Sequence, residues 1–501
     1  MIEPELASTL CNYRIIKPIS QGGFSRVFLL ESQTDNASAR SQYAAKVFKK
    51  ASFFKLFLHE LAMLEKADAS QHTQHLHEAI IDKGYLILIT HYIEGVTLKK
   101  QVDATGGLSQ KETWHIAKKL CSAVAQLHRL GMTHGDIKPS NLLLSPSHRG
   151  VKLWLTDLGC AGQQHTEAWQ GDFSFSAPDV FLCRYSNKAD SYSIGLTLLY
   201  CLTGSLPWIK QKSPDASKVL AHCQIPAPIP KGLHPELNTL LCGLLHKQPR
   251  KRWSTRKAKH FLAKSHWPHG AAQHSALKAP SHFTLSATES YRDAAKMGIP
   301  YAQFRYATEL EQQGDTANAA RWYHRAATRG FSRAMNNLGV IHEKQSLLPQ
   351  ANEWYLRAAQ QNNAHGCFNL ALSYDAKGTP DTIQRAKRLY QRAANYGHER
   401  ALNRLGIAAE RAEKHRQAFE HYLRAAYSGY APAQFNLARY FGSQLNCPLW
   451  PHQRLTLIQS DTQASCRFWL TEAANNGHKR AAALLEKMDQ QAEDIPEQAL
   501  A

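Results

Sequence analysis

The segment His134-Gly-Asp-Ile-Lys-Pro-Ser-Asn141 decides how the N-terminal half of this chain is interpreted, and Asp157-Leu-Gly159 follows sixteen residues after Asn141. A single His-x-Asp often arises by chance, but this eight-residue run with Asp-Leu-Gly at that distance is a specific combination. The two segments supply carboxylates, a lysine and an amide. Together such groups can accept a proton, neutralise a phosphate and hold a divalent cation.

These residue types suit phosphoryl transfer. That reaction depends on positioning and charge neutralisation, because it leaves the protein little covalent chemistry to perform. On this interpretation Asp136 accepts the proton of a substrate hydroxyl, and Lys138 steadies the transferring phosphoryl group. Asn141 and Asp157 are then the predicted Mg²⁺ ligands.

Two features nearer the N-terminus fit the same chemistry. Lys46 lies in the apolar stretch Tyr43-Ala-Ala-Lys-Val47, where a lysine is costly unless it is paired. Glu60 lies in a helical pattern fourteen residues later, and a pair between these side chains would aim the ammonium at nucleotide phosphates. Gly22 and Gly23, between two apparent strands, let the backbone lie against phosphate, although a glycine pair alone usually marks only a hairpin.

Taken together, these segments resemble the eukaryotic-type (Hanks-type) serine/threonine protein kinase domain across residues 13–263. The resemblance implies an α+β bilobal protein-kinase fold, ATP and Mg²⁺ as cofactors, and transfer of the ATP γ-phosphate to protein hydroxyls. It also implies that Ser176-Ala-Pro-Asp179 ends the activation segment and that Asp179 pairs with Arg252. The implied catalytic residues are Asp136, Lys138, Lys46 and Glu60, and the metal ligands are Asn141 and Asp157. The implied nucleotide-binding residues are Ser20, Gly22, Gly23, Phe24, Val27, Ala44, Lys46, Thr90 at the gatekeeper position, His91 and Ile93 at the hinge, and Leu143.

Two residues depart from the family pattern. Gly135 stands where many kinases carry an arginine that receives a phosphorylated activation loop, so we expect activation without loop phosphorylation. Asp172 stands where serine/threonine kinases usually carry threonine. A second carboxylate there would raise the pKa of Asp136 or alter substrate choice.

The C-terminal half repeats an Ala-Ala-x-x-Gly pattern. The first alanines are Ala294, Ala326, Ala358, Ala393, Ala425 and Ala473. Alanine lets two helices approach closely, and glycine, or Asn362 in the third copy, ends a helix in the left-handed conformation. The pattern resembles Sel-1-like repeats, which are related to tetratricopeptide repeats, over residues 288–488. It implies an all-α solenoid of helix pairs that recruits protein substrates or regulators.

Two features of the repeats leave alternatives open. The insertion between Gly442 and Asp461 is expected to be a loop or a partner-specific projection. Arginines precede four of the alanine pairs and would form either a solvated family-typical column, which we favour, or a groove for acidic segments. These arginines are Arg325, Arg357, Arg392 and Arg424.

The predicted organisation is an N-terminal segment (1–12), a kinase domain (13–263), a linker (264–287), the repeats (288–488) and a tail (489–501). No run approaches the ~18 consecutive apolar residues of a membrane span, and the apolar run from Ile194 to Leu202 is expected to be a buried helix. No signal peptide is visible, which predicts a cytoplasmic protein or an effector secreted into another cell. The net charge of +20 is spread along both halves, which disfavours a dedicated nucleic-acid site.

Two other functions remain open. The protein could be a pseudokinase scaffold that acts through its repeats, but retention of Lys46, Asp136, Asn141 and Asp157 argues against it. His-Gly-Asp is also the signature of small-metabolite phosphotransferases with the kinase fold. The Ser-Ala-Pro-Asp element and the Lys-Pro-x-Asn continuation favour a protein kinase over that alternative.

Overall fold

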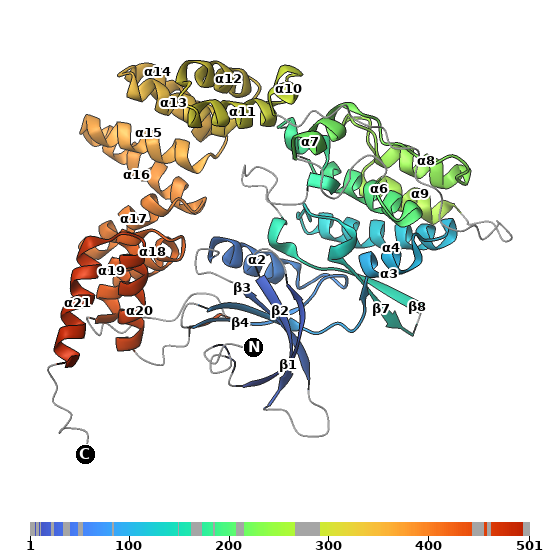
Figure 1. The fold of residues 1–501 in the computed structure, drawn as a ribbon, viewed down its shortest axis with the longest axis horizontal. Coiled ribbons are helices and arrows are strands. Elements are labelled where there is room, and N and C mark those ends of the chain that lie inside the picture. The colour runs from blue at the N-terminus through green and yellow to red at the C-terminus, as the bar shows by residue number, and fades with distance from the viewer. Residues whose placement is uncertain are drawn as a thin grey trace. The chain divides into compact units, whose positions relative to one another are not determined.

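The computed structural model describes most of the chain (Figure 1). The described residues are 6, 10, 12–21, 25–33, 41–48, 54–82, 85–148, 150–161, 173–183, 186–206, 215–265, 291–442, 455–457 and 462–493. They fall into two compact units, which are treated separately. The first unit holds residues 1–62, 75–92 and 367–501, and the second holds residues 63–74 and 93–366.

A six-stranded sheet forms the core of the first unit, in the order β1-β2-β3-β5-β4-β9. Its strands are β1 (Tyr13–Gln21), β2 (Ser25–Ser32), β3 (Gln42–Phe48), β4 (Leu76–Asp82), β5 (Tyr85–His91) and β9 (Leu455–Leu457). Side chains alternate along β3, so Tyr43, Ala45 and Val47 enter one hydrophobic cluster with Phe28 and Ile89. The opposite face of β3 carries Lys46.

The outer strand β9 comes from the insertion in the repeat domain. Its three residues pair in parallel with Ala79, Ile80 and Ile81 of β4. The expectation of a loop or projection is therefore wrong for residues 455–457. The remainder of that insertion lies outside the described residues.

The second unit contains the helical lobe that follows the sheet. A three-stranded sheet is formed by β6 (Val96–Thr97), β7 (Leu142–Ser147) and β8 (Gly150–Leu155). The helices are α3 (Leu98–Thr105), α4 (Gln110–Arg129), α5 (Pro178–Phe181), α6 (Lys188–Thr203), α7 (Asp215–Gln224), α8 (Pro235–Leu244) and α9 (Thr255–Lys264). Helix α6 is buried along nearly its whole length, which confirms the predicted buried helix. Helix α2 (Phe54–Ala67) runs from the first unit into the second.

Twelve further helices follow in the described part of the C-terminal half. They are α10 (Tyr291–Lys296), α11 (Pro300–Gln312), α12 (Thr316–Thr328), α13 (Ser332–Lys344), α14 (Leu348–Gln360), α15 (Ala364–Lys377), α16 (Pro380–Asn395), α17 (Glu399–Arg411), α18 (His415–Tyr427), α19 (Ala431–Gly442), α20 (Thr462–Asn475) and α21 (Lys479–Glu493). Asn362 has a φ of 63°, like the positive-φ glycines that end the other copies, so the predicted helix ends are confirmed. None of the helices in the described ranges combines the length and apolar character needed to cross a bilayer.

Candidate active site

Lys46 and Glu60 form the predicted ion pair within the first unit. Lys46 Nζ lies 2.7 Å from both carboxylate oxygens of Glu60, so the pair is bidentate. Glu60 is 3% exposed, whereas the Lys46 side chain retains 20% exposure. Burial of the carboxylate is tolerable because the ammonium neutralises it. The partly exposed Lys46 remains able to meet an additional anion.

The sheet register gathers other predicted nucleotide-binding residues on the Lys46 face. Val27 lies opposite both Lys46 and Ser20, and Ala44 lies opposite Thr90. Directly opposed residues share a face, and residues two apart on one strand do as well. The described part of the first unit therefore places these five side chains together, on the face opposite the hydrophobic cluster.

Three predicted nucleotide-binding residues, Gly22, Gly23 and Phe24, lie outside the described residues. At the predicted hinge, His91 donates its N–H to the carbonyl of His75 at 3.1 Å, and Tyr92 donates to Gln42 at 3.1 Å. These bonds extend the pairing of β5 as far as the hinge. Leu143 lies on β7 in the second unit, opposite Trp154.

Asp136 is at the centre of the second group of predicted residues. Lys138 Nζ lies 2.8 Å from Asp136 Oδ2, and Asn141 Nδ2 donates to the same oxygen at 2.9 Å. Asn141 also donates to the backbone carbonyl of Asp136 at 3.0 Å, which fixes the amide relative to the carboxylate. Asp136 is 7% exposed. These contacts orient the Asp136 carboxylate, as general-base catalysis requires.

Asp190, at the start of α6, holds the backbone that precedes Asp136. Its two carboxylate oxygens accept the N–H groups of His134 and Gly135, each at 2.9 Å, and His128 Nε2 lies 2.8 Å away. Burial alone would raise the pKa of Asp190, but the hydrogen bond from His128 and the charges of His128 and His134 hold that pKa below its usual value. Asp190 is therefore a buried anion that positions the catalytic segment.

The apolar run predicted a buried helix from Ile194 onward, and no role was assigned to Asp190, which precedes that run. The signal was nevertheless present, since an aspartate that begins an otherwise apolar helix requires buried hydrogen-bond donors.

Gly135 adopts a conformation that other residues avoid. Its φ is +78°, and an added Cβ would lie 2.7 Å from the carbonyl oxygen of Cys160. The backbone conformation at position 135 therefore disfavours arginine in this protein. The glycine also leaves this position without a side chain that could receive a phosphate.

Asp157 and Asn141 are brought together through the backbone. Thr156 donates its N–H to the Asn141 carbonyl at 3.0 Å, immediately before Asp157. Asp157 itself has a φ of 63° and a ψ of 77°, a left-handed conformation that costs energy in a non-glycine residue and is typical of functional sites. Because the amide nitrogen of Asn141 faces Asp136, its amide oxygen points elsewhere.

The side-chain oxygens of Asn141 and Asp157 are of the type that Mg²⁺ binds. The described residues contain no group of three His, Cys, Asp or Glu side chains able to hold a metal by themselves. Mg²⁺ is usually held by one or two carboxylates together with substrate phosphates and water. Asn141 and Asp157 could thus hold a metal ion that phosphate oxygens complete.

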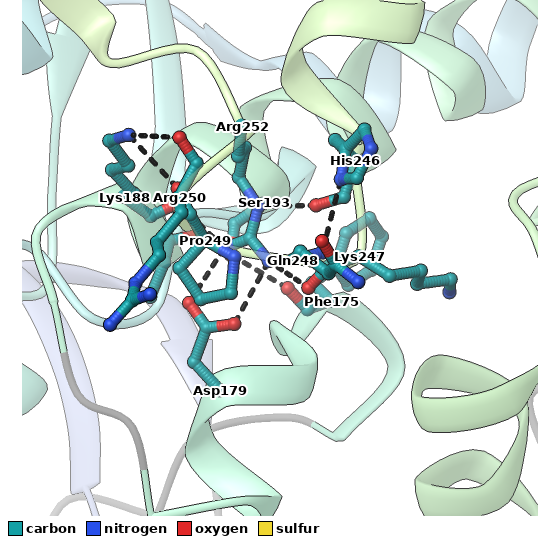
Figure 2. Close-up of polar contacts among 11 residues, drawn as sticks. Phe175, Asp179, Lys188, Ser193, His246, Lys247, Gln248, Pro249, Arg250 and Arg252 are labelled. Carbon is teal, nitrogen blue, oxygen red and sulfur yellow. Dashed lines mark hydrogen bonds and ion pairs between the residues drawn. The ribbon is translucent and has the colours of Figure 1, made fainter.

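The pairing predicted for Asp179 and Arg252 is confirmed (Figure 2). The guanidinium donates to the two carboxylate oxygens at 2.7 and 2.9 Å, and both side chains are fully buried. Its other N–H groups reach backbone carbonyls of Lys188, His246 and Lys247. All five donors of Arg252 are thereby used. Because every N–H donor of Arg252 is hydrogen-bonded, this pair fixes the end of the activation segment to the helical lobe.

Contacts within the repeats engage the repeat arginines Arg325, Arg357 and Arg424. Arg325 lies over the ring of Trp322, and Arg357 over that of Trp354. Arg424 donates to the carbonyl of Ala394 at 3.1 Å. These contacts favour a structural role for the arginines over a groove for acidic segments.

Comparison with known proteins agrees with this geometry. The protein kinase domain family matches residues 13–264, half of the chain. The Sel1 repeat family matches residues 300–331, 332–363, 364–398, 400–430 and 458–478. The chain therefore belongs to the protein kinase family, and its C-terminal half carries Sel1 repeats.

Curated relatives match the kinase half. Ribosomal protein S6 kinase alpha-3 of Mus musculus is 27% identical over 251 residues, covering 48% of this chain and 33% of that protein. Serine/threonine-protein kinase ULK3 of Xenopus laevis is 29% identical over 253 residues, covering 48% and 53%. Serine/threonine-protein kinase PrkC of Bacillus subtilis is 27% identical over 263 residues, covering 48% and 38%. The chain thus spans about a third to a half of the length of these relatives.

Proposed function

We propose that this protein is an ATP-dependent serine/threonine protein kinase, which transfers the γ-phosphate of ATP to protein hydroxyls. The contact of Asp136 with both Lys138 and Asn141 carries this proposal. It joins a carboxylate, a cation and an amide in one cluster, and these groups suit the proposed roles of proton acceptor, charge partner and metal ligand. Similarity to serine/threonine-protein kinases supports the same class.

The proposed roles follow from the contacts. Asp136 orients the substrate hydroxyl and accepts its proton, while Lys138 offsets the negative charge that gathers on the transferring group. Lys46, held by Glu60, binds the ATP phosphates. Mg²⁺ supplies further charge neutralisation when it is bound by Asn141 and Asp157.

Nucleotide binding is assigned to the sheet residues and the hinge. Ala44, Val27 and Leu143 provide apolar contacts for adenine, and the backbone of His91 and Ile93 provides hydrogen bonds. Ser20, Gly22, Gly23 and Phe24 belong to the proposed phosphate loop, and Thr90 to the gatekeeper position.

The repeats are proposed to recruit protein substrates or regulators, with domain limits at residues 13–263 and 288–488. We propose a cytoplasmic compartment or delivery into another cell. No disulfide joins any of the cysteines in the described ranges, which suits a reducing environment.

Activation is proposed to be independent of loop phosphorylation, because Gly135 supplies no arginine to receive a phosphate. Thr166 and Asp172 lie outside the described residues, and Ser174 is only 9% exposed. The purified protein should be active after treatment with a phosphatase. A variant carrying both Thr166→Ala and Ser174→Ala should be active as well. Loss of activity on these changes would refute this regulatory proposal.

The function is tested by measuring phosphate transfer from Mg-ATP to a panel of proteins, peptides and small hydroxyl compounds. Asp136→Asn should lower the rate by about 10²–10⁴-fold, as expected for loss of a general base. Asp103→Asn is the matched control, because Asp103 is an exposed aspartate paired with Lys99. A folded wild type that transfers no phosphate is a pseudokinase, and one that phosphorylates only small molecules is a metabolite kinase.

A further inference from the structure

The first repeat and the helical lobe of the kinase share one hydrophobic core. The kinase side contributes Phe181 of α5 and Ala216, Val219 and Leu220 of α7. The repeat side contributes Tyr291, Ala294, Ala295, Ile299 and Ala302 of the α10–α11 region. All these residues belong to the second unit. The two sides therefore pack together within one compact unit.

Tyr301 is the side chain that joins the two sides most directly. Its ring centroid lies 5.6 Å from that of Phe173 and 5.9 Å from that of Phe181, both in the kinase. It also lies 6.1 Å from Tyr291 and 6.2 Å from Phe331, both in the repeats. These separations are typical of favourable aromatic pairs. One ring thus contacts two kinase rings and two repeat rings.

Two repeat residues, Tyr291 and Arg305, interact electrostatically with Tyr301. These neighbours of Tyr301 on the repeat side lie on α10 and α11.

The two kinase rings belong to the end of the activation segment. Phe173 follows Asp172, and Phe181 closes the short helix that contains Asp179. The Asp179–Arg252 pair ties this segment to the helical lobe. From α7, the His222 ring stacks on Phe181, with the two ring centroids 6.4 Å apart.

Residues 173–181 are consequently held from three directions: by Arg252, by α7 and by Tyr301. Two of these supports belong to the kinase domain, whereas the third belongs to the first repeat. A repeat that only recruited partner proteins would not require an aromatic side chain in contact with residues 173–181.

We propose that the first repeat contributes directly to kinase function. In this proposal Tyr301 is a positioning residue that keeps residues 173–181 in the conformation that accepts a protein substrate. This inference rests on the proposed function. It deepens that function by assigning control of protein-substrate binding to a residue outside the kinase domain. Binding of ATP is not expected to depend on Tyr301.

The test compares full-length Tyr301→Ala and Tyr301→Phe with wild type. The alanine variant should raise KM for a protein substrate on the order of tenfold, because misplaced substrate-contacting groups are costly. Its KM for ATP should stay within about twofold of the wild-type value. A twofold change in a binding constant corresponds to less than about half a kcal/mol. Phenylalanine keeps the ring contacts and should restore KM. If the alanine variant does not fold, Tyr301→Leu replaces it, because leucine keeps much of the volume without the aromatic contacts.

Tyr355→Ala is the matched control, because Tyr355 is a buried repeat tyrosine outside the shared core. It should lower thermal stability without changing the ratio of the two KM values. An unchanged KM for protein in the Tyr301 variant, or an equal rise in the Tyr355 variant, overturns the inference.

Hydrogen exchange separates this inference from the proposed function. In Tyr301→Ala, peptides covering 173–181 and 215–224 should lose protection, whereas Tyr355→Ala should leave them protected. A wild type without transferase activity refutes the proposed function, and exchange still reports whether Tyr301 holds the segment. Unchanged exchange in Tyr301→Ala overturns the inference whatever the activity.

Discussion

Gly135 links backbone conformation to regulation at the level of a single residue. Its positive φ and the nearby Cys160 carbonyl both oppose any side chain. The Cβ of an arginine introduced here would therefore clash with the Cys160 carbonyl. Such a substitution would not simply restore a switch that receives a phosphate. The backbone N–H of Gly135 also contacts Asp190, so a local shift would reach the catalytic segment.

Gly135→Ala is expected to reduce both stability and transferase activity. Gly106→Ala is the control, because Gly106 has a similar φ of +69° and no atom within 4 Å of its added Cβ. The control should cost about 1–2 kcal/mol from backbone conformation alone. Chemical denaturation should show a larger loss for Gly135→Ala, and equal losses would contradict a role for the Cys160 contact.

His222 predicts a loss of stability in acid. Burial, with a smaller contribution from the charge of Lys247, lowers its pKa to about 3 from an ordinary value of 6.5. Between these pH values the unfolded chain binds a proton that the folded protein does not. The free energy of unfolding therefore falls as the pH decreases, by about 1.4 kcal/mol per pH unit for one proton well below pH 6.5.

His222→Asn should weaken this acid sensitivity, because asparagine can still form hydrogen bonds but does not titrate. Urea unfolding at pH 7 and pH 5 measures the effect. The wild type should lose more stability than the variant between these two conditions. Identical losses would show that His222 is not responsible.

The repeat helices share a polar contact that the alanine pattern does not reveal. In four repeats the tyrosine hydroxyl donates to an acidic side chain of the preceding helix, at 2.5–2.8 Å. The pairs are Tyr323–Glu311, Tyr355–Glu343, Tyr390–Asp375 and Tyr422–Glu410. Burial and the neighbouring carboxylate raise the pKa of the Tyr355 hydroxyl, so it stays a donor. Each bond therefore joins adjacent helices.

Tyr355→Phe should lower the free energy of unfolding by roughly 1–3 kcal/mol, since its partner is charged. Tyr374→Phe is the control, because Tyr374 lies on a repeat helix and pairs with no acidic side chain among the residues that the structure describes. Combining Tyr355→Phe with Glu343→Gln should cost less than the sum of the two single changes. Additive effects would mean that the hydrogen bond contributes little.

At the scale of elements, sequence patterns predicted helix ends and motif residues better than they predicted contacts between distant segments. The Ala-Ala-x-x-Gly register predicted the helix ends because glycine or asparagine is needed where φ is positive. The Lys46–Glu60 and Asp179–Arg252 pairs were predicted because their motifs imply specific partners. The aromatic contacts of Tyr301 were missed because a tyrosine in a helical repeat is normally explained by packing within the repeats. Strand β9 was missed because three residues are too few to show alternation.

At the scale of the whole molecule, the shared core predicts that the kinase domain is incomplete by itself. A chain ending at residue 264 would expose Phe181, Val219 and Leu220, which the first repeat covers. Exposed apolar patches of this kind promote aggregation. A chain ending at residue 345 should be more soluble and melt at a higher temperature. Equal melting temperatures for the two chains would contradict the shared core.

Strand β9 predicts a second long-range dependence. Removal of residues 455–457 would leave the edge of β4 unpaired, and unpaired edges associate with other chains. The variant should therefore form larger species in size-exclusion chromatography with light scattering. A deletion of residues 494–501, beyond the end of α21, is the control, and similar behaviour of the two would mean that β9 does not protect the sheet.

The position of β9 in the sequence also has a consequence for biosynthesis. The ribosome completes β4 at Asp82 but reaches Leu455 only after most of the remaining chain. At about 5–20 residues per second, the nascent sheet keeps an open edge for roughly 20 to 75 seconds. We expect this open edge to be exposed to chaperones during that interval, until the C-terminal repeats of the same chain are translated.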